Sequence, residues 1–179
     1  DIALAQGDKN DNTVIHYSVS IPKGDKYITE VKYSDAINGG TAKAIALRLK
    51  QLFFDGDCDY IVMDIAGLGL AVLDALGEYT FDTERDIKYP PMCCFNKEDK
   101  KERCGYREAI PCIYGIVANE EINNAIAVTL KASLNNHTLK FLVNEFEGED
   151  WLNENKNFQM LEASEKVRLM YPYVQTTLT

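Results

Sequence analysis

Alternating apolar and polar positions dominate the start of the chain. Ile2–Leu4 is a short apolar stretch, and Thr13–Ile21 and Tyr27–Tyr33 alternate with a period of two, as half-buried strands do. Gly7–Asn12 and Pro22–Asp25 are rich in turn-forming residues and separate these three segments. The pattern therefore predicts an antiparallel meander of three strands joined by short turns.

The spacing becomes helical after this meander. Thr41 is placed as an N-cap, and apolar residues recur at helical positions from Ala44 to Phe53. Tyr60–Asp64 follows as a nearly continuous apolar run, the pattern of a strand buried on both faces. Ala66–Gly69 then opens a second helix that continues to Leu76. The expected order is three strands, a helix, a central strand and a helix.

The rest of the chain mixes regular and irregular segments. Residues 79–110 show little periodicity and contain Pro90-Pro91, so an irregular insertion is expected there. The later elements predicted are a strand at Ile113–Val117, a helix at Glu120–Leu134, an extended segment at Leu139–Val143 and a helix at Leu161–Tyr171. The prediction is a single α/β domain over residues 1–179, with a central mixed sheet flanked by helices. Because the sequence starts at Asp1 rather than Met, we expect a piece of a larger chain.

Composition and charge narrow the class of protein. The 179 residues are 46% hydrophobic with a formal net charge of −9, as in a globular protein without a membrane span or signal peptide. The negative charge argues against broad attraction to nucleic acid, although clustered carboxylates that hold metals add to the same count. A basic group between Lys97 and Arg107 is interleaved with acidic residues. We interpret it as a solvated, charge-balanced loop.

The five cysteines do not form a recognisable metal motif. No CxxC pair is present among Cys58, Cys93, Cys94, Cys104 and Cys112. Their number is odd, which argues against a framework of disulfides. We therefore expect reduced, partly buried thiols and no structural zinc.

A carboxylate at the end of an apolar strand is the most informative chemical feature. Asp64 closes the Tyr60–Met63 run, and Asp1 lies at the edge of the first predicted strand. A pair of divalent ions held by such carboxylates can activate water and stabilise the leaving oxygen of a phosphodiester. The plainer alternatives are a helix cap or a lysine partner for Asp64, and simple solvation for Asp1. Asp8 and Asp11 are interpreted as turn residues.

Several segments, in order along nearly the whole chain, resemble the nuclease domain of phage terminase large subunits. They are Asp1-Ile2-Ala3-Leu4, Asp8–Val14, Asp64–Gly69, Asn96, Glu102-Arg103-Cys104, Pro111–Tyr114, Asn123-Asn124 and Tyr171–Thr177. The resemblance implies an RNase H-like fold that cuts concatemeric viral DNA during genome packaging. It also implies that Asp1 and Asp64 are catalytic residues that bind two Mg²⁺ or Mn²⁺ ions. The third acidic ligand of the family comes from near the end of the domain, where this sequence offers no match.

The same resemblance implies partners and a location. Double-stranded DNA would be the substrate, and the portal protein and the terminase small subunit would be partners. An ATPase domain would lie upstream in the parent chain, and the setting would be the cytoplasm of an infected or lysogenic bacterial host.

Three other interpretations fit part of the pattern. Gly67 and Gly69 after a strand suggest dinucleotide binding, but we discount it, because the third glycine of that fingerprint would fall at Val72 and Asp64 would point negative charge toward a pyrophosphate. A noncatalytic module that docks on the portal or capsid fits the charge of −9. Another RNase H-like nuclease, such as a resolvase or transposase core, would share the same order of elements.

Overall fold

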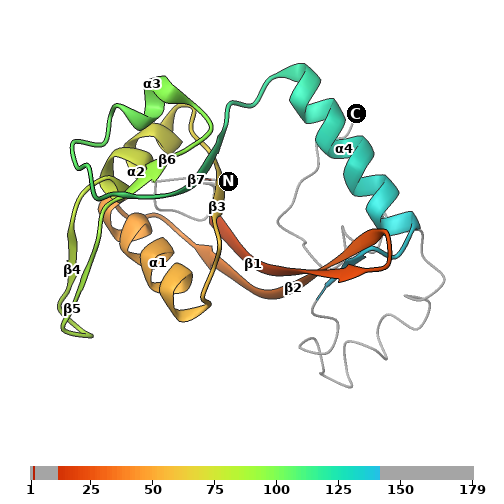
Figure 1. The fold of residues 1–179 in the computed structure, drawn as a ribbon, viewed down its shortest axis with the longest axis horizontal. Coiled ribbons are helices and arrows are strands. Elements are labelled where there is room, and N and C mark those ends of the chain that lie inside the picture. Colours follow the sequence, from red (N-terminus) through yellow and green to blue (C-terminus); the bar gives the residue numbers. More distant parts are fainter. Residues whose placement is uncertain (1, 3–11, 142–179) are drawn as a thin grey trace. The chain divides into compact units, whose positions relative to one another are not determined.

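In the computed structural model, Ile2 and residues 12–141 are described (Figure 1). The elements follow in the order β1 (Thr13–Lys23), β2 (Lys26–Ile37), α1 (Ala42–Asp55), β3 (Ile61–Asp64), α2 (Leu68–Leu76), β4 (Thr80–Asp82), β5 (Ile87–Tyr89), β6 (Met92–Cys94), α3 (Glu98–Lys101), β7 (Ile110–Ile116), α4 (Glu120–Asn135) and β8 (Leu139–Lys140). The predicted mixed α/β class is confirmed. The predicted strand at Ile2–Leu4, except for Ile2, and the helix at Leu161–Tyr171 lie outside the described residues.

The chain divides into two compact units, whereas a single domain was predicted from the sequence. One unit comprises the described part of residues 1–17 and 34–119, and the other that of 18–33 and 120–179. The chain passes between the units three times: inside β1 at Tyr17/Ser18, inside β2 at Tyr33/Ser34, and between β7 and α4 at Asn119/Glu120. Two of these crossings lie within strands, and the third lies in the short connection Val117-Ala118-Asn119, so no stretch rich in glycine, proline or serine marks a boundary in the sequence.

Strands β1 and β2 form the predicted hairpin. Gly24 takes a φ of 64° in the two-residue turn between them, a conformation that glycine adopts without steric cost at the first position of a type II′ turn. In β1 the exposed residues His16, Ser18 and Ser20 alternate with less exposed neighbours, as predicted. The short strand β8 pairs in parallel with β2, so this sheet combines antiparallel and parallel strands.

The other three-stranded sheet is parallel and carries the main core. Its order is β3-β7-β6. Helices α1 and α2 pack on one another and, together with these strands, surround one buried apolar cluster. The cluster contains Ile45, Ala46 and Phe53 of α1, Met63 and Ile65 at the end of β3, Val72, Leu73 and Leu76 of α2, and Met92, Cys94, Cys112 and Ile113 of β6 and β7. The predicted cap of α1 is confirmed, since the Thr41 side chain accepts a hydrogen bond from Ala44 N.

Strand β3 is buried on one face only, contrary to the prediction from its apolar sequence. Met63 is 8% exposed, but Val62, on the opposite face, is 53% exposed. Tyr114, its register partner on β7, is 43% exposed and packs against the ring of Phe95. Together with Tyr60, these side chains form an open apolar face of the sheet in the described part of the chain. The error came from hydrophobicity alone, which cannot distinguish a strand buried on two faces from one that leaves a face uncovered.

Residues 79–110 contain more regular structure than expected. Strands β4 and β5 form an antiparallel hairpin, and β6 joins the central sheet. Short strands of three residues leave almost no periodicity in the sequence, which explains why this stretch resembled an insertion.

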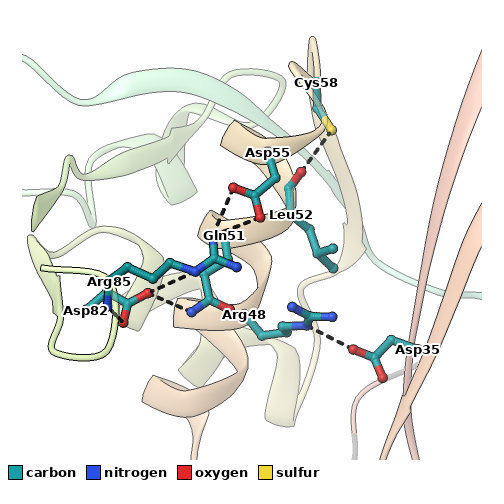
Figure 2. Close-up of polar contacts among 8 residues, drawn as sticks. All are labelled: Asp35, Arg48, Gln51, Leu52, Asp55, Cys58, Asp82 and Arg85. Atoms are coloured by element: carbon teal, nitrogen blue, oxygen red, sulfur yellow. Dashed lines mark hydrogen bonds and ion pairs between the residues drawn. The ribbon is translucent and has the colours of Figure 1, made fainter. Parts of the chain in front are cut away.

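Polar side chains of α1 hold the β4–β5 hairpin (Figure 2). Gln51 donates to the buried carboxylate of Asp82 at 2.7 Å, and Asp55 accepts two hydrogen bonds from Arg85 at 2.8 and 2.9 Å. Lys50 is fully buried in α1 and donates to the Glu78 carbonyl and the Thr80 hydroxyl. Buried polar groups must be paired in this way because an unpaired group costs free energy. Hydrogen bonds from α1 thus hold both ends of strand β4 and the turn that follows it.

None of the helices in the described residues combines the length and the apolar character that crossing a bilayer requires.

Candidate functional site

Asp64 lies at the carboxyl end of β3 with its side chain exposed. Its Oδ1 accepts a hydrogen bond from Ala66 N at 2.9 Å, which is the geometry of an Asx turn. Among the described residues no lysine or arginine forms an ion pair with this carboxylate. The lysine partner considered from the sequence is therefore not found among the described residues. The Asp64 side chain instead stabilises the local turn.

Two glycines shape the turn that follows Asp64. Gly67, the N-cap of α2, has a φ of 52°, in the region that other residues rarely adopt. A Cβ on Gly69 would overlap the carbonyl oxygen of Asp64. The first turn of α2 therefore approaches the backbone of Asp64 more closely than any side chain would permit. These glycines serve the turn from strand to helix, which accounts for the spacing that suggested dinucleotide binding.

The carboxyl ends of the neighbouring strands lie beside Asp64. Asp64 pairs in register with Ile116 of β7, and Ile65 N donates to the Ile116 carbonyl at 2.8 Å. Beyond the end of β6, the side-chain amide of Asn96 exchanges hydrogen bonds of 2.9 and 2.8 Å with the backbone of Gly115. The Asn96 side chain thus continues the strand pairing where β6 has ended. The carbonyl oxygen of Asn96 is thus already engaged, whereas the second carboxylate oxygen of Asp64 accepts no hydrogen bond from the described residues.

The predicted partner of Asp64 lies outside the described residues, as does any third acidic ligand near the chain's end. Asp1 is not described, but its neighbour Ile2 packs against the core cluster, and a Cβ on Gly69 would lie 3.7 Å from Ile2 Cδ1. In the described part of the chain, no group of three or more His, Cys, Asp or Glu side chains is arranged to hold a metal ion. Asp64 by itself is the part of the predicted two-ion site whose position is known.

The cysteines are free thiols, three of them buried. Burial raises the pKa of Cys112 to about 12, which keeps this thiol protonated at neutral pH and a poor nucleophile. Their failure to bind zinc remains a prediction.

The basic run between Lys97 and Arg107 is largely neutralised by local ion pairs. Arg103 pairs with Asp74 at 2.6 Å, Lys100 with Asp99 at 3.0 Å, and Lys101 with Glu98 at 3.7 Å. These contacts agree with the interpretation of a charge-balanced surface segment.

Sequence reasoning missed the buried polar contacts beneath the hairpin. Lys50 falls at a core-facing position of α1, four residues after Ala46 and three before Phe53. A lysine on the apolar stripe of a helix is a usable signal of a buried amine. Asp82 carries no such signal. Its partner Gln51 lies 31 residues away in the sequence, and its other partner, Arg85, lies three residues away but not in a helix whose spacing would have predicted the contact.

Comparisons with protein-family models, curated proteins and solved structures found no match to this chain.

Proposed function

We propose that this chain is the nuclease domain of a phage terminase large subunit, a metal-dependent DNA endonuclease with an RNase H-like fold. The observation that carries the proposal is the state of Asp64. Its carboxylate is exposed at the carboxyl end of a parallel strand and has no cationic partner among the described residues. A carboxylate placed in this way has a free oxygen for a hard divalent ion.

The order of the elements supports the RNase H-like assignment. The β1–β2 hairpin precedes α1, and α1 precedes the strand that ends in Asp64. In the described sheet β3 pairs on one side only, with β7. The proposal assigns the predicted first strand to the other edge of β3, which would bring Asp1 beside Asp64.

The proposed chemistry divides roles between the ions and the protein. When bound, two Mg²⁺ or Mn²⁺ ions lower the pKa of the attacking water and neutralise charge on the phosphate. Asp64 and Asp1 would hold these ions. The close approach of Gly69 to the Asp64 backbone fixes where the Asp64 carboxylate is presented. The third carboxylate, the portal protein and the small subunit would come from elsewhere in the parent chain or the packaging assembly.

The test is plasmid nicking by the chain extended at its carboxyl end, with Mn²⁺ or Mg²⁺ present. We expect nicked and linear products, and no products after addition of EDTA. Asp64→Asn should lose the activity, as should Asp1→Asn, because the charge that holds the ion is removed. Asp59→Asn is the matched control, since Asp59 is an exposed aspartate just before the same strand. Asp11→Asn should likewise stay active.

Cleavage that continues in Asp64→Asn, or that is indifferent to EDTA, would overturn the proposal. Calorimetric titration with Mn²⁺ gives a second reading that does not depend on turnover. Wild-type protein should bind Mn²⁺ more tightly than Asp64→Asn, whereas Asp59→Asn should bind as the wild type does.

A second candidate, a noncatalytic docking module, is favoured by the open apolar face. Val62, Tyr114 and Phe95 expose apolar surface on adjacent strands, and exposed apolar patches commonly mark protein contacts. Absence of metal binding together with capture of a purified portal protein would favour this candidate. Val62→Lys should then abolish capture without affecting the fold.

A further inference from the structure

Two tyrosines meet at the base of the β4–β5 hairpin. The rings of Tyr79 and Tyr106 lie 5.2 Å apart, centroid to centroid, with their planes 82° apart. Tyr79 is 39% exposed. Two perpendicular rings of this kind form an aromatic corner at the surface. The face of an aromatic ring carries negative electrostatic potential and attracts cations.

Two carboxylates fix the phenols of this corner. Tyr79 Oη donates to Glu108 Oε1 at 3.0 Å, and Tyr106 Oη donates to Glu78 Oε2 at 3.1 Å. The hydrogen bond to Glu108 raises the pKa of Tyr79, and the one to Glu78 raises that of Tyr106. Both phenols therefore stay neutral donors at physiological pH, and the two carboxylates add negative charge beside the rings.

The residues on each side of Tyr79 are held from within the fold, one through its backbone carbonyl and the other through its side-chain hydroxyl. The buried amine of Lys50 donates to the Glu78 carbonyl and to the Thr80 hydroxyl. The residues flanking Tyr79 are thus anchored to α1. A ring held in this way needs little reorganisation when it binds a ligand, and such pre-organisation favours affinity.

One cation is already seated on this corner. The Lys88 ammonium lies over the Tyr79 ring, 4.2 Å from its centroid. Lys88 comes from β5, the partner strand of the hairpin. Its position shows that the ring face accepts an alkylammonium group, and the carboxylates of Glu78 and Glu108 together outweigh its single positive charge.

We propose that Tyr79, Tyr106, Glu78 and Glu108 form a binding site for an alkylammonium group of a ligand or partner, and that Lys88 occupies this site when the ligand is absent. The site is independent of Asp64 and of the proposed nuclease activity. A lysine of a partner protein and a small quaternary ammonium ion share the chemistry that it recognises. Lys88 acts as an internal competitor, so its removal should strengthen binding.

The test is a titration with tetramethylammonium chloride, followed by NMR of the Tyr79 ring, with sodium chloride at equal concentration as the salt control. The wild-type Tyr79 resonance should shift with tetramethylammonium. Lys88→Met keeps most of the apolar stem, and its affinity should be about two- to fivefold higher, the effect of one exposed cation–π contact. Tyr79→Leu in the Lys88→Met background, read at Tyr106, should abolish the shift.

Tyr114→Leu is the matched control, because Tyr114 is an exposed tyrosine in a ring pair with Phe95. This variant should bind as the wild type does.

Short peptides with lysine or trimethyllysine show whether the ligand is a partner protein or a small ammonium ion, since a preference for either peptide over tetramethylammonium indicates a protein partner. Equal affinity of Lys88→Met and wild type, or equal shifts with sodium chloride, would overturn the proposal. Circular dichroism confirms that each variant is folded.

Discussion

Asp82 and Asp64 start from the same local geometry and end in opposite environments. Each accepts a hydrogen bond from the backbone N–H two residues later, at 3.0 Å for Asp82 and 2.9 Å for Asp64. Asp82 is 1% exposed and also accepts from Gln51 and pairs with Arg85. Asp64 is exposed and has no ion-pair partner among the described residues.

The comparison separates a structural carboxylate from one available for chemistry. The charge of Asp82 is satisfied by the fold, so removing it should disturb stability. The charge of Asp64 is exposed to solvent and accepts one backbone N–H, so removing the charge should destabilise the fold little. If the proposed function is correct, removing the charge of Asp64 should abolish nearly all of the DNA cleavage.

The largest expected effect is on cleavage. Asp64→Asn should lower the rate of plasmid nicking on the order of a hundredfold or more, because the charge that would hold the metal ions is lost. Asp82→Asn should retain a rate near that of the wild type at a temperature where it is folded. Equal losses of nicking rate in the two variants would show that Asp64 is no more important for cleavage than the structural Asp82.

A glycine substitution tests how Asp64 is presented. In Gly69→Ala the new methyl group would overlap the Asp64 carbonyl oxygen, and overpacking of this kind costs about 1–3 kcal/mol. Gly105→Ala serves as the control, because a Cβ there meets nothing within 4 Å. Urea denaturation should show the loss for Gly69→Ala alone. Unchanged stability of Gly69→Ala would mean that α2 can shift away from Asp64 freely.

Acid should reduce the contribution of Asp82 to stability. The hydrogen bond from Gln51 is the main cause that lowers the pKa of Asp82 below its ordinary 3.8. A lowered folded-state pKa stabilises the fold above pH 3.8 and loses that effect as the pH falls through the folded value. Asp82→Asn should therefore melt on the order of 5 °C lower than wild type at pH 6, and the gap should narrow toward pH 3. If the difference in melting temperature between the two proteins stays constant with pH, the ionised carboxylate of Asp82 is not what stabilises the fold.

An effect confined to alkaline pH is expected from Lys50. Burial lowers the pKa of this amine from 10.5 to about 8. The charged amine is therefore unfavourable in the folded state below pH 8, and this cost is relieved as the pH rises from 8 to 10.5. Relative to Lys50→Met, wild-type stability should rise over that range, by at most about 1.4 kcal/mol per pH unit. Parallel stability curves for the two proteins would contradict the prediction.

The elements predicted from the sequence were those long enough to show a hydrophobic period, together with β3, which was predicted from a continuous apolar run. The β1–β2 hairpin, the Thr41 cap of α1, strand β3, helix α2 and helix α4 all lie close to the predicted positions. Strands β4, β5 and β6 were missed because three residues cannot display a period. The exposure of Val62 was missed because it depends on what covers the sheet, which is a tertiary property.

The candidate site could be predicted only in part. Asp64 was identified from one carboxylate at the end of an apolar run, and its place at the strand's carboxyl end is as predicted. The contact of Gly69 with the Asp64 backbone depends on the approach of α2, which no spacing encodes. The association of Asp1 with Asp64 stays a prediction.

The passage of two of the three unit boundaries through β1 and β2 restricts how this protein could change in evolution. A single residue inserted at Tyr17/Ser18 would move every later side chain of β1 to the opposite face, because strand side chains alternate. A matching insertion at Tyr33/Ser34 would be needed to restore the pairing. At the Gly24-Asp25 turn, by contrast, added residues extend only a loop. Insertions and deletions should therefore be tolerated mainly at the Gly24-Asp25 turn. An insertion in β1 at Tyr17/Ser18 should be tolerated only together with one in β2 at Tyr33/Ser34.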